Sequence, residues 1–284
     1  MKSRLELDRG LARHGVVGSE PRDDFYGYIG SHPDRFGATG LKMELAVWGK
    51  SLLRNDRPMP FVIYGRPRSG TTLFVHLLDQ IPGVRCDGEL FHFLLLSPRG
   101  FARRLPKRAG PGVRAYGFKL LSYQLMDVQR IRRPLAFFDW IGGHGYSVVH
   151  INRNTWDQTI SLAKAHASNV YFNKSGDTQV LRLDPARVLK LLKWNDDMLA
   201  YENEVMSYVP HLTIDYDRDL ANASNQQYTI DRMCDYIGVP SAEVSARMRR
   251  TGGKEGLQQV ENIEDLVAHV RRSPLSHLLP RELV

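Results

Sequence analysis

The sequence predicts an α/β protein of the P-loop-like class, a three-layer sandwich in which helices flank a central parallel sheet. From Pro60 onward, short apolar runs alternate with segments of helical periodicity, an order typical of parallel strands joined by helical crossovers. The first apolar run leads into a glycine-rich turn, GRPRSGTT (65–72), which opens an amphipathic helix. We expect residues 58–284 to form this domain. Residues 1–57, polar apart from one amphipathic piece at 40–53, are expected to form an N-terminal helical extension.

Four segments are expected to form the strands. FVIY (61–64) is a continuous apolar run, as a parallel strand covered on both faces should be. AYGFKLL (115–121), YSVVHIN (146–152) and HLTIDY (211–216) follow it along the chain as three more strands.

One long helix is expected from about Pro185 to Ser207, because apolar residues recur between them at helical spacing. Pro185 suits the first turn of this helix, and Pro210 stops it. A shorter helix is expected in the C-terminal tail from Ile263.

The charge of the chain indicates an anionic partner. The formal net charge is +8 and the pI is about 9.5. The cations form clusters, any one of which could be an ordinary solvated surface, at residues 103–108, 130–133, 247–250 and 271–272. None is interleaved with aromatic residues, so we expect no nucleic-acid partner.

The two cysteines, Cys86 and Cys234, lie far apart and form no pattern with neighbouring histidines. We therefore expect neither a zinc site nor a disulfide framework, and a reducing, cytoplasmic location. No run of about 18 apolar residues is present, so integral membrane insertion is not expected. The N-terminus lacks the apolar region of a secretion signal.

The turn at 65–72 has the features of an anion-binding loop. Glycines let the backbone approach an anion closely, and the N–H groups of the turn and of the following helix point toward it. Ser69, Thr71 and Thr72 add hydroxyl donors, and Arg68 adds a permanent charge in a planar fork.

The lysine of a nucleotide-hydrolysing P-loop is replaced here by Thr71. Phosphoryl transfer also needs an acidic residue on the metal. The only apolar run with such an acid contains Asp139, and we interpret it as an ordinary segment before a turn. A ligand with fewer charges that needs no magnesium, such as a phosphosulfate, fits this loop better.

GRPRSGTT resembles the 5′-phosphosulfate loop of the sulfotransferases that use 3′-phosphoadenosine 5′-phosphosulfate (PAPS). The resemblance implies PAPS as co-substrate, with no metal. It assigns the 5′-phosphosulfate to Arg68, Ser69, Gly70, Thr71 and Thr72, and we add Arg66 of the same loop as a cofactor-binding residue. Many family members have Lys at position 68; an arginine there would act electrostatically, because it does not give up its proton.

A second match follows the strand at 146–152. Arg153 comes directly after this strand, Asn154 can cap a helix that reaches Ser168, and Ser161 lies eight residues after Arg153. In the sulfotransferase family an Arg and a Ser at this spacing grip the 3′-phosphate of PAPS.

The third family element, a glycine-rich C-terminal loop with basic residues, is matched loosely by RRTGGKEG (249–256). Lys254, with Arg249 or Arg250, would contact the same phosphate, although the usual Arg-Lys-Gly order is missing. Leu73 stands where eukaryotic cytosolic members have a Trp that stacks on adenine, so the stacking residue is open.

The acceptor side is expected in CDGELFHF (86–93), which offers Glu89 and His92 as general bases. Bacterial carbohydrate sulfotransferases of the nodulation-factor, lipopolysaccharide and trehalose type have a similar Gly-Glu here. By this resemblance Glu89 is the base, and His92 is the alternative.

YGFKLLSYQ (116–124) also resembles those bacterial enzymes. Lys119 would be costly to bury unpaired, so we expect it to face the active site and orient Glu89 or the acceptor; otherwise it is a lysine snorkelling at a strand edge. We interpret Asp217 and Asp219 as caps at a helix start.

The sequence thus predicts a sulfotransferase that moves the sulfuryl group of PAPS to a hydroxyl of a glycan, glycolipid or small metabolite. Residues 94–114 are interpreted as a mobile lid whose cations favour an acidic acceptor. Residues 1–57 could belong to the acceptor site or to a homodimer contact. The alternatives are a P-loop kinase or ATPase and a non-catalytic polyanion-binding protein.

Overall fold

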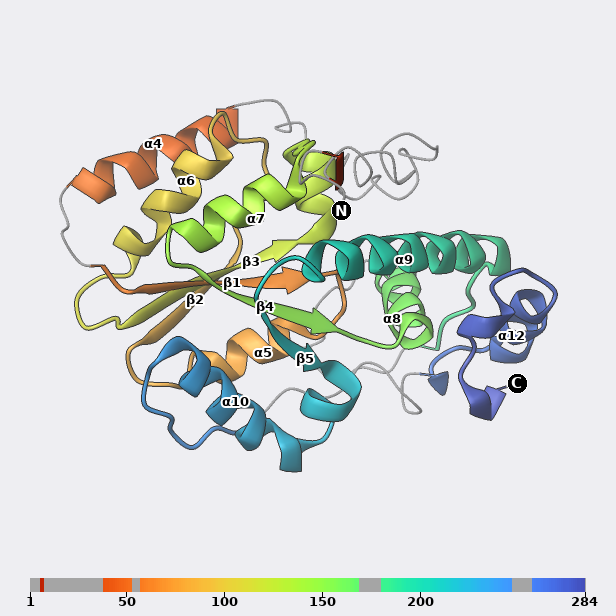
Figure 1. Cartoon of the computed structure of the whole chain (residues 1–284). Helices are drawn as coiled ribbons and strands as arrows, with labels where there is room; N and C mark the ends of the chain where they lie inside the picture. The colour runs from red at the N-terminus through yellow and green to blue at the C-terminus, as the bar shows by residue number, and fades with distance from the viewer. Residues whose placement is uncertain (1–5, 8–37, 53–56, 169–179, 247–256, 284) are drawn as a thin grey trace.

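The computed structural model describes residues 6–7, 38–52, 57–168, 180–246 and 257–283. Helices flank both faces of a parallel five-stranded sheet (Figure 1), which confirms the predicted P-loop-like α/β sandwich. None of the helices in the described ranges is long and apolar enough to cross a membrane.

The strand order is β2-β3-β1-β4-β5, and all neighbouring pairs are parallel. The strands are β1 (Met59–Gly65), β2 (Val84–Glu89), β3 (Ala115–Leu121), β4 (Ser147–Asn152) and β5 (Leu212–Asp215). The chain leaves β1 toward β2 on one side and leaves β4 toward β5 on the other. The carboxyl ends of β1 and β4 are therefore a topological switch point, the usual place for a ligand in an open α/β sheet.

Sequence reasoning missed β2. This edge strand is short and alternates buried with partly exposed residues, and its polar side chains hide the apolar pattern. The other four strands agree with the predicted segments to within one or two residues at each end.

The helices form two outer layers and one lateral group. α4 (Ala38–Leu52), α6 (Pro98–Arg104) and α7 (Pro134–Gly143) lie on one face of the sheet, and α5 (Thr71–Leu78) and α10 (Ala223–Ile237) on the other (Figure 1). The lateral group contains α8 (Thr155–Ser168), α9 (Pro185–Met206) and α12 (Ile263–Arg271). These helices share an apolar cluster, and the C-terminal half of α9 also packs in the core with α7. Short helical turns occupy Leu105–Arg108, Gln124–Val128, Tyr216–Leu220, Ser276–Leu278 and Arg281–Leu283.

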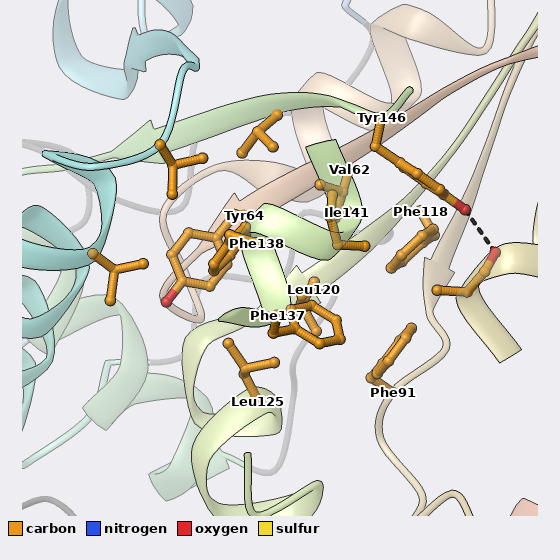
Figure 2. Close-up of a cluster of buried hydrophobic side chains, with 14 of the residues drawn as sticks. Val62, Tyr64, Phe91, Phe118, Leu120, Leu125, Phe137, Phe138, Ile141 and Tyr146 are labelled. Atoms are coloured by element: carbon orange, nitrogen blue, oxygen red, sulfur yellow. Dashed lines mark hydrogen bonds between the residues drawn. The ribbon is translucent and has the colours of Figure 1, made fainter. Parts of the chain in front are cut away.

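Aromatic side chains dominate the core between the sheet and α7 (Figure 2). Tyr64 meets Phe138 edge-on with ring centroids 5.0 Å apart, and Phe91 stacks on Phe118 at 5.2 Å. Burying a side chain of this size stabilises the fold by roughly 1.5–3 kcal/mol. This core gives the carboxyl edge of the sheet a rigid base.

The predicted helices of the lateral group are confirmed. α9 runs from Pro185 to Met206, and the Asp184 side chain caps it by accepting from the Ala186 N–H at 3.0 Å. Asn154 Oδ1 accepts from the Asp157 N–H at 3.0 Å, so it caps α8 as expected. The helix expected from Ile263 is α12.

The interpretation of 94–114 as a mobile lid is wrong. Phe101 and Leu105 are buried in the aromatic core, and the Tyr146 hydroxyl donates to the Ala102 carbonyl at 2.7 Å (Figure 2). α4 packs over α6, where Glu44 accepts from the N–H groups of residues 96 and 97. The glycines and prolines of this segment suggested mobility, but its apolar residues anchor it.

The segment around Asp139 is an apolar segment before a turn, as expected. It forms α7, which begins at Pro134, a residue suited to a helix's first turn. Asp139 itself is exposed on this helix. The division at residue 57 stays a prediction.

We expect Phe101→Ala to lower the free energy of unfolding by about 3–5 kcal/mol, because it leaves a cavity in a packed core. Denaturant unfolding measures this change. The matched control is Arg103→Ala on the exposed face of the same helix, which should change stability by no more than about 0.5 kcal/mol. Similar small effects of both variants would contradict the packing described for this segment.

Candidate functional site

The turn after β1 is held between β4 and Tyr216 in a conformation that requires glycine. Gly70, with φ +94°, is the N-cap of α5, and a Cβ there would lie 2.1 Å from the Tyr216 ring. At Gly65 a Cβ would lie 2.6 Å from the Ile151 carbonyl oxygen. The N–H groups at the start of α5 thus lie at the carboxyl edge of the sheet, as an anion-binding turn requires.

The two predicted anchors meet. Arg153 Nη1 donates to the Arg68 carbonyl oxygen at 2.9 Å, and Arg68 Nε donates to Ser161 Oγ at 3.1 Å. Arg68 and Arg153 are 85 positions apart in the chain, and the pairing of β1 with β4 brings them together. A single ligand can therefore contact both signatures.

Several polar atoms at this junction await a partner. Ser69 Oγ, Arg153 Nε and Arg153 Nη2 are buried and have no hydrogen-bond partner among the described residues. The Arg153 guanidinium lies over the Tyr216 ring, 4.4 Å from its centroid, which leaves its remaining N–H groups available. Buried donors without partners are costly, so an anion bound here would relieve the cost.

Arg66 has a different role from the predicted one. Its side chain is completely buried: Nη1 donates to the Asn195 carbonyl at 2.9 Å and Nη2 to Asn152 Oδ1 at 2.8 Å. Nε lies 3.4 Å from Glu202 Oε2, and burial lowers the pKa of the guanidinium while Glu202 counteracts this. Arg66 therefore does not fit as a direct ligand of a bound anion. Its hydrogen bonds instead join the end of β1 to the end of β4 and to α9, below the site.

Glu89 lies at the end of β2 in a hydrogen-bonded chain that reaches the turn. Lys119 Nζ donates to Glu89 Oε1 at 3.1 Å and to Thr72 Oγ1 at 3.2 Å, and Gln124 Nε2 donates to Glu89 Oε2 at 3.0 Å. The Glu89 side chain is 31% exposed and that of Lys119 only 7%. The expected proximity of Lys119 to Glu89 is confirmed. Gln124 was missed because it lies in an irregular turn after β3.

Three other predicted residues make their contacts outside this chain of hydrogen bonds. The His92 ring Nδ1 is 3.4 Å from the Tyr123 hydroxyl. Asp217 and Asp219 are not caps of the helix that follows them. Asp217 Oδ2 accepts from the Asn154 N–H at 2.9 Å, and Asp219 pairs with Arg218; the N-caps there are Asp215 and Asn222.

Two further titratable groups on α8, the Lys164 ammonium and the His166 imidazole, were missed by sequence reasoning. Burial and the Arg68 charge lower the pKa of Lys164 to about 8, and burial, Arg187 and Arg68 lower that of His166 to about 4. Lys164 Nζ donates to Gln259 Oε1 at 2.6 Å. The only signal in the sequence is that Lys164 lies one helical turn after Ser161.

Positive charge is therefore concentrated around Arg68, where an anion would be stabilised. Lys254, Arg249 and Arg250 lie outside the described residues. Leu73 packs against the apolar cluster under α5.

No protein-family model matches the chain. Among curated proteins, it is 25% identical over 238 residues to nodulation protein H of Rhizobium meliloti strain 1021, a match that covers 76% of this chain and 93% of that protein. The chain is therefore similar to nodulation protein H over most of the length of both proteins. A second nodulation protein H from Rhizobium meliloti matches this chain with the same identity and coverage.

Solved sulfotransferase structures are also similar. That of Alicyclobacillus acidocaldarius is 16% identical, with 80% of this chain and 99% of that chain covered and a TM-score of 0.45. STF9 of Mycobacterium avium is 11% identical over 96% and 89% of the two chains, with a TM-score of 0.44. Mouse SULT7A1 complexed with PAP is 12% identical over 82% and 73%, with a TM-score of 0.41.

We expect Gly70→Ala to destabilise the protein by about 1–3 kcal/mol, because alanine is strained at this φ and its Cβ would displace the Tyr216 ring. Thermal unfolding measures the loss. Gly142→Ala in α7 is the control: its Cβ meets nothing within 4 Å, so it should be neutral or slightly stabilising. Equal stability of the two variants would contradict the described turn.

Proposed function

We propose that this protein is a sulfotransferase that transfers the sulfuryl group of PAPS to a hydroxyl group of its acceptor. The observation that carries the proposal is the junction of Arg68 with Arg153 and Ser161. A basic, buried junction with unpartnered donors suits a ligand that carries two anionic groups on one small molecule.

PAPS is a substrate that fits the residues present. The N–H groups at the start of α5, the hydroxyls of Ser69, Thr71 and Thr72, and the Arg68 guanidinium would hold its 5′-phosphosulfate. The unpartnered Nε and Nη2 of Arg153 and the hydroxyl of Ser161 would hold its 3′-phosphate. Lys254 is proposed as a further phosphate ligand.

Glu89 is proposed as the general base. Each of its oxygens accepts one hydrogen bond inside the protein, and a carboxylate oxygen can accept a second from an acceptor hydroxyl. As the acceptor oxygen forms its bond to sulfur, the bond from sulfur to the 5′-phosphate oxygen breaks. The hydroxyl proton passes to Glu89, and 3′,5′-ADP leaves with the electron pair.

The negative charge that develops on the departing phosphate is stabilised by Arg68 and by the N–H groups of the turn. Lys119 acts as a positioning residue that links Glu89 to Thr72 and so fixes the base relative to the turn. A base that is already held in this geometry loses less conformational entropy on reaching the transition state than a mobile base would.

The proposed acceptor is a hydroxyl of a glycan, glycolipid or small metabolite. This class rests on the likeness of residues 86–93 and 116–124 to bacterial carbohydrate sulfotransferases. An acceptor screen with PAPS, followed by release of 3′,5′-ADP, identifies the compound.

We expect Glu89→Gln to lower kcat by about 10²–10⁴-fold, the usual contribution of a general base, while 3′,5′-ADP affinity stays within about two-fold. Steady-state turnover and calorimetric nucleotide binding measure the two effects. Asp87→Asn, a carboxyl change on the same strand, is the matched control and should leave turnover nearly unchanged.

A turnover loss in His92→Gln with full activity in Glu89→Gln would assign the base to His92. Absence of 3′,5′-ADP binding, with magnesium-dependent binding of ATP, would replace the proposed function by a kinase or ATPase. Salt-sensitive retention on heparin that survives Arg68→Ala, without nucleotide binding, would instead favour a polyanion-binding protein.

We expect 3′,5′-ADP binding at pH 8 to be accompanied by uptake of up to about half a proton. Lys164, with a pKa of about 8, is half neutral at this pH, and a phosphate nearby would raise its pKa and protonate it. Affinity should therefore fall as the pH rises above 8. The His166 imidazole, with a pKa of about 4, stays neutral in this range.

Calorimetry in buffers of different ionisation enthalpy measures this uptake. Lys164→Met should abolish it, whereas Lys190→Met, on the exposed side of α9, should not. Unchanged proton uptake in Lys164→Met would show that the bound nucleotide does not raise the pKa of Lys164.

A further inference from the structure

α4 presents an apolar stripe to solvent. Leu41, Leu45, Trp48 and Leu52 follow one another at spacings of four, three and four residues, which places them on one side of the helix. Their exposed fractions are 41%, 61%, 52% and 80%. A different side of α4, with Gly40, Glu44, Val47 and Ser51, is the one buried against α6 and the turn after it.

The surroundings of this stripe are strongly basic. α4 and residues 97–108 lie side by side on the outer layer of the same face of the sheet (Figure 1). Together they contain one carboxylate, Glu44, which is 8% exposed and already accepts two backbone N–H groups. Their cations, all at least partly exposed, are Lys42, Lys50, Arg99, Arg103, Arg104, Lys107 and Arg108.

Trp48 joins the two features. The Arg104 guanidinium lies over the Trp48 indole, 4.2 Å from the ring centroid, so an aromatic ring and a cation share one surface position. Tryptophan favours the interface between hydrocarbon and water, and arginine favours anionic headgroups. A protein partner would have to bring both an apolar groove and a large excess of carboxylates, whereas an anionic bilayer offers both properties at once.

We propose that the α4 surface, defined as the stripe Leu41, Leu45, Trp48 and Leu52 with the cations of α4 and residues 97–108, binds the anionic lipid surface of a membrane. α4 lies in the plane of the headgroups, with the stripe inserted at the boundary of the acyl chains and the cations facing the lipid phosphates. The contact is peripheral and reversible. It is independent of the proposed sulfuryl transfer.

Sedimentation of the full chain with lipid vesicles tests the proposal. We expect binding to vesicles of phosphatidylcholine and phosphatidylglycerol in equal amounts, weak binding to phosphatidylcholine alone, and weaker binding as salt rises. Trp48 is the only exposed tryptophan of the four, all of which lie in described ranges, so its fluorescence should shift to shorter wavelength on binding.

Variants separate the two contributions. Leu45→Glu should lower vesicle binding by at least about ten-fold, because it places a carboxylate on the inserted stripe. Arg103→Ala should lower it by about five-fold, as expected for one cation near an anionic surface. Tyr228→Glu is the matched control and should bind vesicles normally: Tyr228 is 67% exposed and pairs with Arg232, but it lies on α10, across the sheet.

Retained binding of 3′,5′-ADP or an unchanged unfolding transition shows that each variant is folded. The proposal would be overturned if the unaltered chain and Leu45→Glu bound equally well, and to both kinds of vesicle alike. A chain that binds neither vesicle but forms a dimer, with Leu45→Glu monomeric, would also overturn it and assign the stripe to an interface between two copies.

Discussion

The site depends on one buried cation. Arg66 follows β1 directly, and its guanidinium joins β1 to two segments that are distant in the sequence: the end of β4 at Asn152 and Arg153, and helix α9 through Asn195 and Glu202. Removing a buried guanidinium's partners is far more costly than losing a surface ion pair. The relative positions of the turn and of Arg153 are therefore fixed before any ligand binds, which lowers the entropic cost of binding.

The strand order positions the other residues of the site around the turn. Because β1 lies between β3 and β4, the turn that follows β1 has Lys119 on one side and Arg153 on the other. The base and the nucleotide anchors thus reach one turn from opposite directions. The side chain of Lys119 is only 7% exposed, and the cost of burying its charge is offset because Glu89 and Thr72 accept its hydrogen bonds. Packing, charge pairing and geometry of the site are one arrangement, built at a single edge of the sheet.

Much of this arrangement was predictable from the sequence, and the failures have physical causes. Arg68 was recognisable from the strand, turn and helix pattern around it, and Ser161 from the resemblance of its spacing after Arg153 to the sulfotransferase signature. Arg66 was misassigned because a sequence pattern does not tell a buried guanidinium from an exposed one. β2 was missed because an edge strand needs apolar residues on fewer positions. Residues 94–114 were misinterpreted because loop-forming glycines and prolines flank the buried Phe101 and Ala102, and the Ala102 carbonyl accepts from the distant Tyr146 hydroxyl. Lys164 gave only a weak signal, its position one helical turn after Ser161, since its importance comes from tertiary proximity to Arg68.

The backbone of Arg68 has one more consequence. Its φ of +65° lies in the left-handed region, which costs a residue with a Cβ roughly 1–2 kcal/mol and which glycine enters freely. The backbone conformation alone favours glycine at position 68, so the guanidinium is the reason for an arginine there. In a lineage that had lost its chemistry, this position should drift toward glycine or asparagine while Gly70 persisted. The residue at position 68 should therefore distinguish homologues that keep the activity from homologues that have lost it.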